Sequence, residues 1–170
     1  MRIAVLVGNP KAESRTLRVA LGVARALKDS LATDSDLLVV DLAEVAQSLF
    51  DYESDTIPQL LREVAASNVV LVASPTYKAT YTGLLKVFLD RYGNDGLAGT
   101  VCIPIMTGAA SIHALSPEVH LRPLLVELGA SVPTRGLYVT EQQFDDLDGV
   151  IANWLSAALP LLTRAISPAT

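Results

Sequence analysis

The chain has 170 residues, a length typical of one domain, so we expect a single domain over residues 1–170. Eighteen acidic and thirteen basic residues give a formal net charge of −5, which argues against nucleic acid as the main partner because phosphate-binding surfaces are normally basic. No apolar run approaches the roughly 18 residues of a membrane span and no signal peptide is recognisable, so we expect a cytoplasmic protein without a membrane partner.

Five short apolar runs are predicted to form the strands of a parallel sheet. They are Ile3–Val7, Leu37–Val40, Val69–Ala73, Val101–Met106 and Leu137–Val139, of which the last is the weakest. None alternates between apolar and polar residues, which is typical of strands buried on both faces. Within the fourth run, Pro104 predicts a bulge or an edge-like break, because proline cannot donate to the ladder.

The segments between these runs have the period of helices. Apolar residues recur every three or four positions over Leu17–Leu31 and over Tyr81–Tyr92. Ser116, followed by proline and glutamate, is predicted to be the N-cap of another helix. The last helix is expected to begin near Asp145 and to be kinked or broken at Pro160.

Strands that alternate with helices predict a doubly wound α/β fold. In such sheets ligands bind outside the carboxyl ends of the strands, at the point where the strand order reverses. Three loops therefore become candidates for a site: Gly8–Thr16, Ser74–Tyr81 and Thr107–His113.

The first of these loops has the composition of an anion site. Ser14 and Thr16 offer hydroxyls and Lys11 and Arg15 offer cations at the start of a helix, where phosphate groups bind well. The loop lacks both the GxGxxG and the GxxxxGK[ST] pattern, so it is neither a dinucleotide fingerprint nor a Walker loop. A simple helix cap beside two solvated basic residues is the alternative interpretation.

The other two loops are suited to a flat heterocycle. Pro75 ends a strand, the backbone after it can offer amide and carbonyl groups to a ring edge, and Tyr77 can form an aromatic wall. In the loop after the fourth strand, small residues let the backbone approach a ligand closely, and His113 can donate to a carbonyl. The alternatives are an ordinary turn and a structural histidine. There is no GxSxG elbow, and two histidines with one cysteine do not make a metal site.

Three motifs together carry a family resemblance over nearly the whole chain. Gly8–Thr16 is similar to G-S-P-R-x-x-S-x-T, and Pro75–Lys86 is similar to P-V-Y-K-A-x-Y-[ST]-G-x-x-K. Thr107–His113, with Leu121–Pro123 after it, is similar to T-G-G-x-x-x-H with L-[RK]-P. The chain thus resembles the flavodoxin-like NAD(P)H-dependent FMN reductases, in particular those that supply reduced FMN to two-component sulfonate monooxygenases. The resemblance implies a flavodoxin-like five-stranded parallel sheet with helices on both faces.

The resemblance also implies which residues hold FMN. Asn9 stands where the family usually has serine and Lys11 where it usually has arginine, and both replacements keep a donor or a cation. The implied phosphate ligands are Asn9, Lys11, Ser14, Arg15 and Thr16, and the implied neighbours of the isoalloxazine ring are Pro75, Thr76, Tyr77, Lys78, Gly108, Ala109 and His113.

The implied reaction is hydride transfer from NADPH or NADH to N5 of FMN, which needs no side chain as acid or base. FMN would leave as a substrate and serve a flavin-dependent monooxygenase. The alternatives are a quinone or azo-compound reductase that retains FMN, and a flavodoxin-type electron carrier. The low share of charged residues, 18%, and the family's use of the position of Tyr81 at a subunit interface predict a homodimer or homotetramer.

Overall fold

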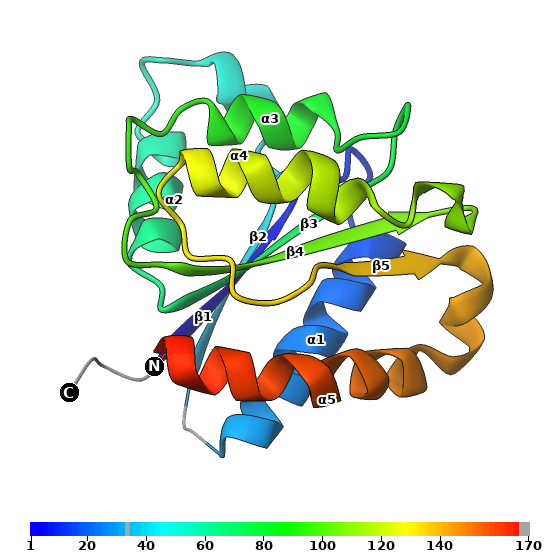
Figure 1. Ribbon diagram of the computed structural model, residues 1–170. Coiled ribbons are helices and arrows are strands. Elements are labelled where there is room, and N and C mark those ends of the chain that lie inside the picture. Colours follow the sequence, from blue (N-terminus) through cyan, green and yellow to red (C-terminus); the bar gives the residue numbers. More distant parts are fainter. Residues whose placement is uncertain (33–34, 167–170) are drawn as a thin grey trace.

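The computed structural model describes residues 1–32 and 35–166 and contains one five-stranded parallel sheet (Figure 1). The strand order is β2-β1-β3-β4-β5, so the order reverses between β1 and β3. This is the flavodoxin-like order, and it confirms the predicted fold class. The strands are β1 (Arg2–Val7), β2 (Asp36–Asp41), β3 (Val69–Pro75), β4 (Val101–Gly108) and β5 (Leu137–Thr140).

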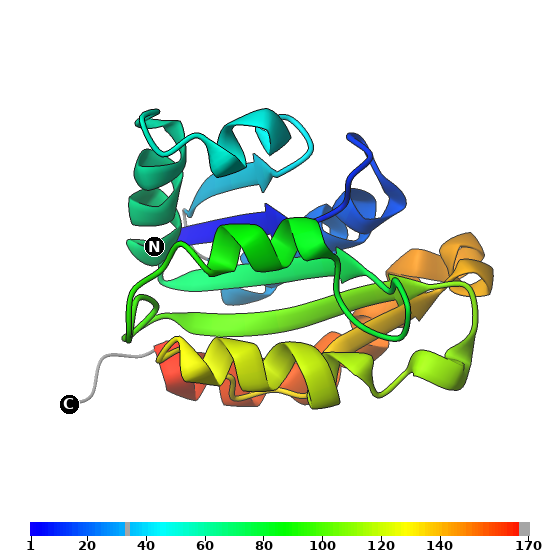
Figure 2. The ribbon, with the colours of Figure 1, turned by 90° about the horizontal axis from the view of Figure 1, so that it is seen from above.

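Helices cover both faces of the sheet, as Figures 1 and 2 show. Val5 and Val7 of β1 pack on the face covered by α1 and α5, whereas Ala4 and Leu6 pack on the face covered by α2, α3 and α4. This alternation follows from the two-residue period of a strand and explains why the run of β1 is apolar throughout. For the edge strand β2 the expected burial on both faces is wrong, since Leu37 and Val39 are 46% and 43% exposed. The helices are α1 (Arg15–Leu31), α2 (Thr56–Ala65), α3 (Gly83–Leu89), α4 (Arg122–Glu127) and α5 (Leu147–Ile166), and shorter 3₁₀ helices lie at Ala46–Phe50, Ser111–His113 and Glu141–Asp146.

Pro104 lies inside β4 without a bulge, so that part of the prediction is wrong. Its register with β3 is continuous. The N–H of Cys102 donates to the carbonyl of Ser131, on the side of β4 away from β3. The nitrogen of Pro104, two residues later, faces the same side. There β5 begins only at Leu137, opposite Ile105. The strand is therefore edge-like on one side at Pro104, and no hydrogen bond of the ladder is lost.

Two predicted helix signals act differently from expectation. Ser116 has helical backbone angles, and its hydroxyl donates to the carbonyl of Ala79 at 3.0 Å rather than capping a helix. The chain enters α4 through a π-helical turn, Pro117–Leu121. Pro160 does not break α5, which is continuous. The carbonyl that loses its helical donor belongs to Ser156, an exposed residue, so water can satisfy it.

The segment Glu141–Ile166, which contains α5, is long and apolar enough by length and composition to cross a membrane. In the fold, its inward residues Leu147, Ile151, Leu155 and Leu162 are buried in the core that the sheet shares with α1. The helix therefore completes one layer of the α/β sandwich.

Candidate functional site

A cavity of about 440 Å³ opens at the carboxyl ends of the strands, where the strand order reverses. The three loops selected from the sequence converge on it, because parallel strands end at the same edge of the sheet. Ten of the twelve predicted site residues line the cavity, whereas Lys78 and His113 do not. The lining consists of Asn9, Lys11, Glu13, Ser14, Arg15, Thr16, Pro75, Thr76, Tyr77, Thr107, Gly108, Ala109, Glu141 and Phe144.

Buried polar side chains form the base of the cavity on the α1 side. The Asn9 side-chain amide donates to Oγ1 of Thr16 at 3.1 Å, and Thr16 Oγ1 lies 2.8 Å from Oγ1 of Thr107. The backbone N–H of Lys11 donates to Oδ1 of Asn9 at 2.9 Å. These bonds connect the loop after β1 to β4. Asn9 and Thr16 thus fix the shape of the loop, and their side chains already bond to protein groups.

The start of α1 supplies the anion-binding geometry. Ser14 is the N-cap, and its Oγ accepts a hydrogen bond from the backbone N–H of Leu17 at 3.2 Å. The loop reaches this cap through Glu13, whose φ of 52° lies in the left-handed region. The N–H groups of a first helical turn point out of the helix and carry its positive end. This arrangement suits a phosphate group.

Glu141 and Phe144 also line the cavity, and sequence reasoning missed both. Nη2 of Arg15 lies 2.5 Å from Oε1 of Glu141, and the guanidinium lies 5.7 Å from the centroid of the Phe144 ring. Both residues follow β5, whose carboxyl end lies at the same sheet edge as those of the other strands. The strand order could have indicated them, but the sequence pattern predicts only a helix start near Asp145 and assigns no role to Glu141 or Phe144.

The formal charges around the cavity balance. Lys11 and Arg15 contribute two cations, and Glu13 and Glu141 contribute two carboxylates. An anion at α1 therefore meets helix amides and local cations but no excess of positive charge.

The loop after β3 forms the opposite wall. The N–H of Thr76 donates to the carbonyl of Thr107 at 2.7 Å, which fixes the strand end. The hydroxyl oxygen of Thr76 is buried and has no hydrogen-bond partner among the described residues. A buried hydroxyl without a partner is unfavourable, and a ligand with a polar edge would satisfy it. Tyr77, 53% exposed, stands at the rim.

A tight turn follows Tyr77 and explains where Lys78 lies. Tyr77 and Thr80 exchange two backbone hydrogen bonds, of 2.8 and 3.2 Å. The two residues between them, Lys78 and Ala79, have φ values of 51° and 70°. A two-residue turn with both φ values positive has the geometry of type I′, which normally favours asparagine and glycine. The turn directs Lys78 away from the cavity lining, and its lysine–alanine sequence stores backbone strain.

The loop after β4 approaches the cavity through backbone atoms. A Cβ at Gly108 would lie only 2.0 Å from the hydroxyl oxygen of Tyr138, so a larger residue there would require the Tyr138 side chain to move. The same hydroxyl donates to the carbonyl of Ala110 at 3.0 Å and holds the loop from beneath. His113 lies in the next 3₁₀ helix, outside the lining.

The loops after β1 and β3 are joined below the cavity by Thr82, the buried N-cap of α3. Its hydroxyl donates to the carbonyl of Gly8 at 2.5 Å, and its N–H donates to Oγ of Ser74 at 3.0 Å. A Cβ at Gly8 would lie 2.4 Å from Cβ of Leu85. The floor of the site is thus closely packed.

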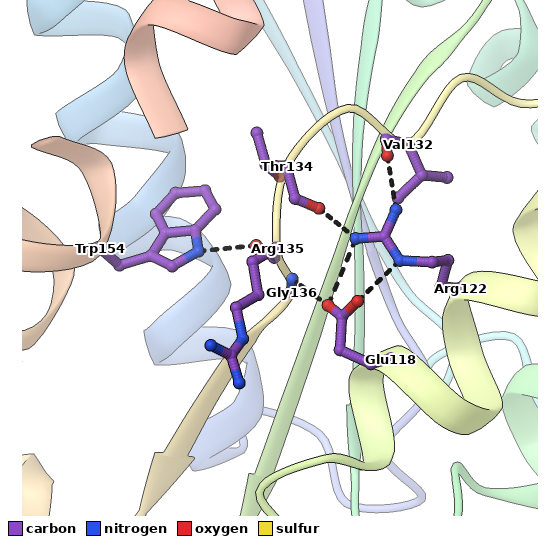
Figure 3. A network of polar contacts seen from close by, with 7 residues as sticks. All are labelled: Glu118, Arg122, Val132, Thr134, Arg135, Gly136 and Trp154. Atoms are coloured by element: carbon purple, nitrogen blue, oxygen red, sulfur yellow. Dashed lines mark hydrogen bonds and ion pairs between the residues drawn. The ribbon is translucent and has the colours of Figure 1, made fainter. Parts of the chain in front are cut away.

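A second arginine–glutamate pair joins Arg122 of the motif Leu121–Pro123 to Glu118 of the preceding π-helical turn (Figure 3). Arg122 Nε donates to Oε2 of Glu118 at 2.8 Å, and its two other nitrogens donate to the carbonyls of Val132 and Thr134. Oε1 of Glu118 accepts the N–H of Gly136 at 2.5 Å. Burial opposes ionisation of Glu118, but the hydrogen bonds from Arg122 and Gly136, together with the positive charges of Arg122 and Arg135, outweigh it and hold the pKa of this carboxyl below its ordinary value. The pair positions the segment that leads into β5.

Comparison with known proteins identifies relatives of the whole fold. The family described as NADPH-dependent FMN reductase matches residues 1–145. The NADH-dependent FMN reductase SfnF of Pseudomonas putida is 31% identical over 150 residues, which cover 85% of this chain and 80% of that protein. The FMN reductase (NADPH) of Escherichia coli is 30% identical over 149 residues, which cover 86% of this chain and 76% of that protein.

A solved structure agrees with these relatives. The apo form of an NADH:FMN oxidoreductase superposes with a TM-score of 0.85 at 26% identity, covering 96% of this chain and 89% of that one. The matches confirm the predicted family, the oxidoreductase class, and FMN with a reduced nicotinamide as its cofactors. The chain belongs to the NADPH-dependent FMN reductase family.

Proposed function

We propose that the cavity at β1, β3 and β4 binds FMN and that the protein reduces it with NADPH or NADH. One observation carries this proposal: the cavity joins the amino end of α1, an anion site, to the buried and unpartnered hydroxyl of Thr76. A phosphate at one end and a polar ring edge at the other satisfy both. The volume of about 440 Å³ is within the range of small-molecule sites.

The proposed phosphate contacts come from the first turn of α1. Ser14, Arg15 and Thr16 present their backbone N–H groups there, and Lys11 adds a cation at the rim. Asn9 supports this loop from below through Thr16. We assign it to the site as a structural residue.

The isoalloxazine ring is proposed to lie between the loops after β3 and β4. Pro75, Thr76 and Tyr77 form one wall, and Gly108 and Ala109 form the other. Lys78 shapes the turn behind this wall. His113 lies farther along the second loop, and we propose no contact with the ring for it.

FMN supplies the chemistry when it is bound, since its ring accepts the hydride of a reduced nicotinamide at N5. The protein holds the phosphate, orients the ring and limits water around it. No side chain has to hold or move a proton.

We further propose that FMN is a substrate that dissociates and then serves a flavin-dependent monooxygenase. The balanced charge of the lining supports this, because the cavity carries no net positive charge that would attract a phosphate strongly. A reductase that passes flavin on should bind it at about micromolar strength, near −8 kcal/mol. A much tighter site would retain the product.

Assembly into a homodimer or homotetramer in the cytoplasm is part of the proposal. Leu115 before the π-helical turn, Val119 within it and Val126 of α4 are each more than half exposed. Together with the half-buried Tyr81 before α3, they offer an apolar surface on this face. Light scattering at micromolar concentration should give a mass of twice or four times 18.1 kDa. A monomeric mass would contradict both the proposed interface and the role of Tyr81 in it.

The decisive experiment is a steady-state assay with NADPH or NADH and free FMN. We expect a nearly colourless protein whose nicotinamide oxidation saturates with added FMN. A yellow protein that keeps FMN through gel filtration and reduces quinones without added flavin would establish the alternative reductase. Bound FMN without nicotinamide oxidation would instead indicate an electron carrier.

A further inference from the structure

Arg15 and Glu141 form an ion pair across the rim of the cavity. They lie 126 positions apart in the sequence, and both line the space where FMN is proposed to bind. Their side chains are 64% and 50% exposed. An exposed pair contributes little to stability and is screened by salt, so its partners can separate at small cost.

Local structure fixes the carboxylate in this place. Glu141 begins the 3₁₀ helix that follows β5, and Thr140 and Gln143 form a capping box around that start. Residues three apart in a 3₁₀ helix lie on the same face, so Glu141 and Phe144 both point toward Arg15. The ring of Phe144 contacts the guanidinium as well. The fold therefore presents a carboxylate directly to the arginine.

The same guanidinium is the strongest phosphate donor that the loop after β1 offers. It belongs to the first turn of α1, between Ser14 and Thr16, where the helix amides attract an anion. Arginine forms charge-assisted hydrogen bonds with carboxylates and phosphates through the same nitrogens. A phosphate at this end must share Arg15 with Glu141 or displace it.

We propose that Glu141 competes with the FMN phosphate for Arg15 and thereby lowers the affinity of the site for FMN. This inference rests on the proposed function of the cavity. The competition acts on the phosphate alone, so it weakens FMN but not riboflavin, which has the same ring without the charged group. Glu141 therefore limits how far the protein favours the phosphorylated flavin and helps to keep FMN exchangeable.

The test compares Glu141→Gln with the full-length parent by titrating FMN and riboflavin and following flavin fluorescence at low salt. Glutamine keeps the size of the side chain and removes its charge. We expect the FMN dissociation constant to fall about two- to fivefold, the range of an exposed ion pair, while riboflavin binding stays unchanged. Glu127→Gln is the matched control, since it removes an exposed carboxylate that does not line the cavity.

A second background tests whether the effect passes through Arg15. In an Arg15→Ala protein, Glu141→Gln should leave FMN affinity almost unchanged, because the shared partner is gone. An undiminished effect in that background would overturn the competition and indicate direct repulsion of the phosphate. Circular dichroism of each variant checks that the exposed substitutions leave the fold intact.

The outcomes separate this inference from the proposed function. If the parent prefers FMN to riboflavin and reduces it, but Glu141→Gln leaves the preference unchanged or weakens FMN, only the role of Glu141 is wrong. Weaker FMN binding would mean that Glu141 holds Arg15 in place for the phosphate. If the parent binds FMN and riboflavin equally, the phosphate site itself is wrong, and the competition is overturned with it.

Discussion

Two arginine–glutamate pairs flank β5, and they differ in what surrounds them. Arg122 and Glu118 are 27% and 26% exposed, and they bond to each other and to the backbone of the segment before β5 (Figure 3). Arg15 of α1 and Glu141, which directly follows β5, are 64% and 50% exposed, and among the described residues these two side chains hydrogen-bond only to each other. The sheltered pair is a clamp within the fold, and the exposed pair is a contact that a ligand can replace.

The difference shows that burial and additional partners, more than the identity of the two residues, determine the role of an ion pair. A charge that loses its partner away from water bears the full penalty of desolvation, whereas one at the surface is resolvated. Four experiments test this contrast.

The largest expected effect is on stability. Arg122→Ala removes the cationic partner of the Glu118 carboxylate and the hydrogen-bond donor of two backbone carbonyls, so the free energy of unfolding should fall by about 3 kcal/mol. Arg15→Ala should lower it by less than about 1 kcal/mol. Urea denaturation of both variants measures the difference. Equal losses would contradict the contrast.

The second effect is on FMN binding, which should depend on Arg15 of the exposed pair. Arg15→Ala should weaken FMN about tenfold or more, because a charge-assisted hydrogen bond is worth roughly 1.5–3 kcal/mol. Riboflavin should bind parent and variant alike. Arg25→Ala, an exposed arginine of α1 outside the cavity, is the control. An equal loss for riboflavin would exclude Arg15 as a phosphate ligand.

The third effect is a dependence of stability on pH. The pKa of Glu118 is lowered in the folded protein from its ordinary value of 4.5, so its ionised form stabilises the fold at higher pH. This contribution is lost as the pH falls through the folded pKa. The difference in unfolding free energy between parent and Glu118→Gln should therefore be full at pH 7 and shrink toward pH 3. A constant difference would assign the effect to packing.

The smallest effect is that of salt. The stability difference between the parent and Arg15→Ala should vanish near 1 M salt, where the Debye length is about 3 Å. The loss in Arg122→Ala should persist, because its partners are sheltered and include backbone carbonyls. Urea titrations at two ionic strengths measure the stability loss in each variant. If salt reduced both losses equally, the contrast between the exposed and the sheltered pair would be wrong.

Much of the fold could be predicted because β1, β3 and β4 are short apolar runs buried on both faces, whereas the edge strand β2 leaves Leu37 and Val39 exposed. Parallel strands end at one edge, so the convergence of the loops after β1, β3 and β4 followed from the strand assignment alone. Pro104 was harder to interpret, since its effect depends on where a neighbouring strand begins. That point lies 33 positions away, at Leu137.

The candidate site was predicted less completely, for two physical reasons. Glu141 and Phe144 follow β5, the weakest run in the sequence, and become part of the cavity only through tertiary contact with Arg15. Lys78 is diverted by a type I′ turn that has neither asparagine nor glycine in its centre, so local sequence gave no signal for it. Both cases depend on packing that no local pattern encodes.

The burial of Cys102 has a consequence for durability. Reduced flavin that escapes into aerated solution reacts with oxygen, so a protein that releases it works close to peroxide. Cys102 lies near the start of β4, between β3 and the chain that leads to β5, with no exposed surface, and this burial raises the pKa of its thiol to about 12. Oxidants attack the thiolate of an accessible cysteine. Under the proposed release of reduced flavin, the one sulfhydryl of this chain is thus kept both protonated and out of reach of the resulting peroxide.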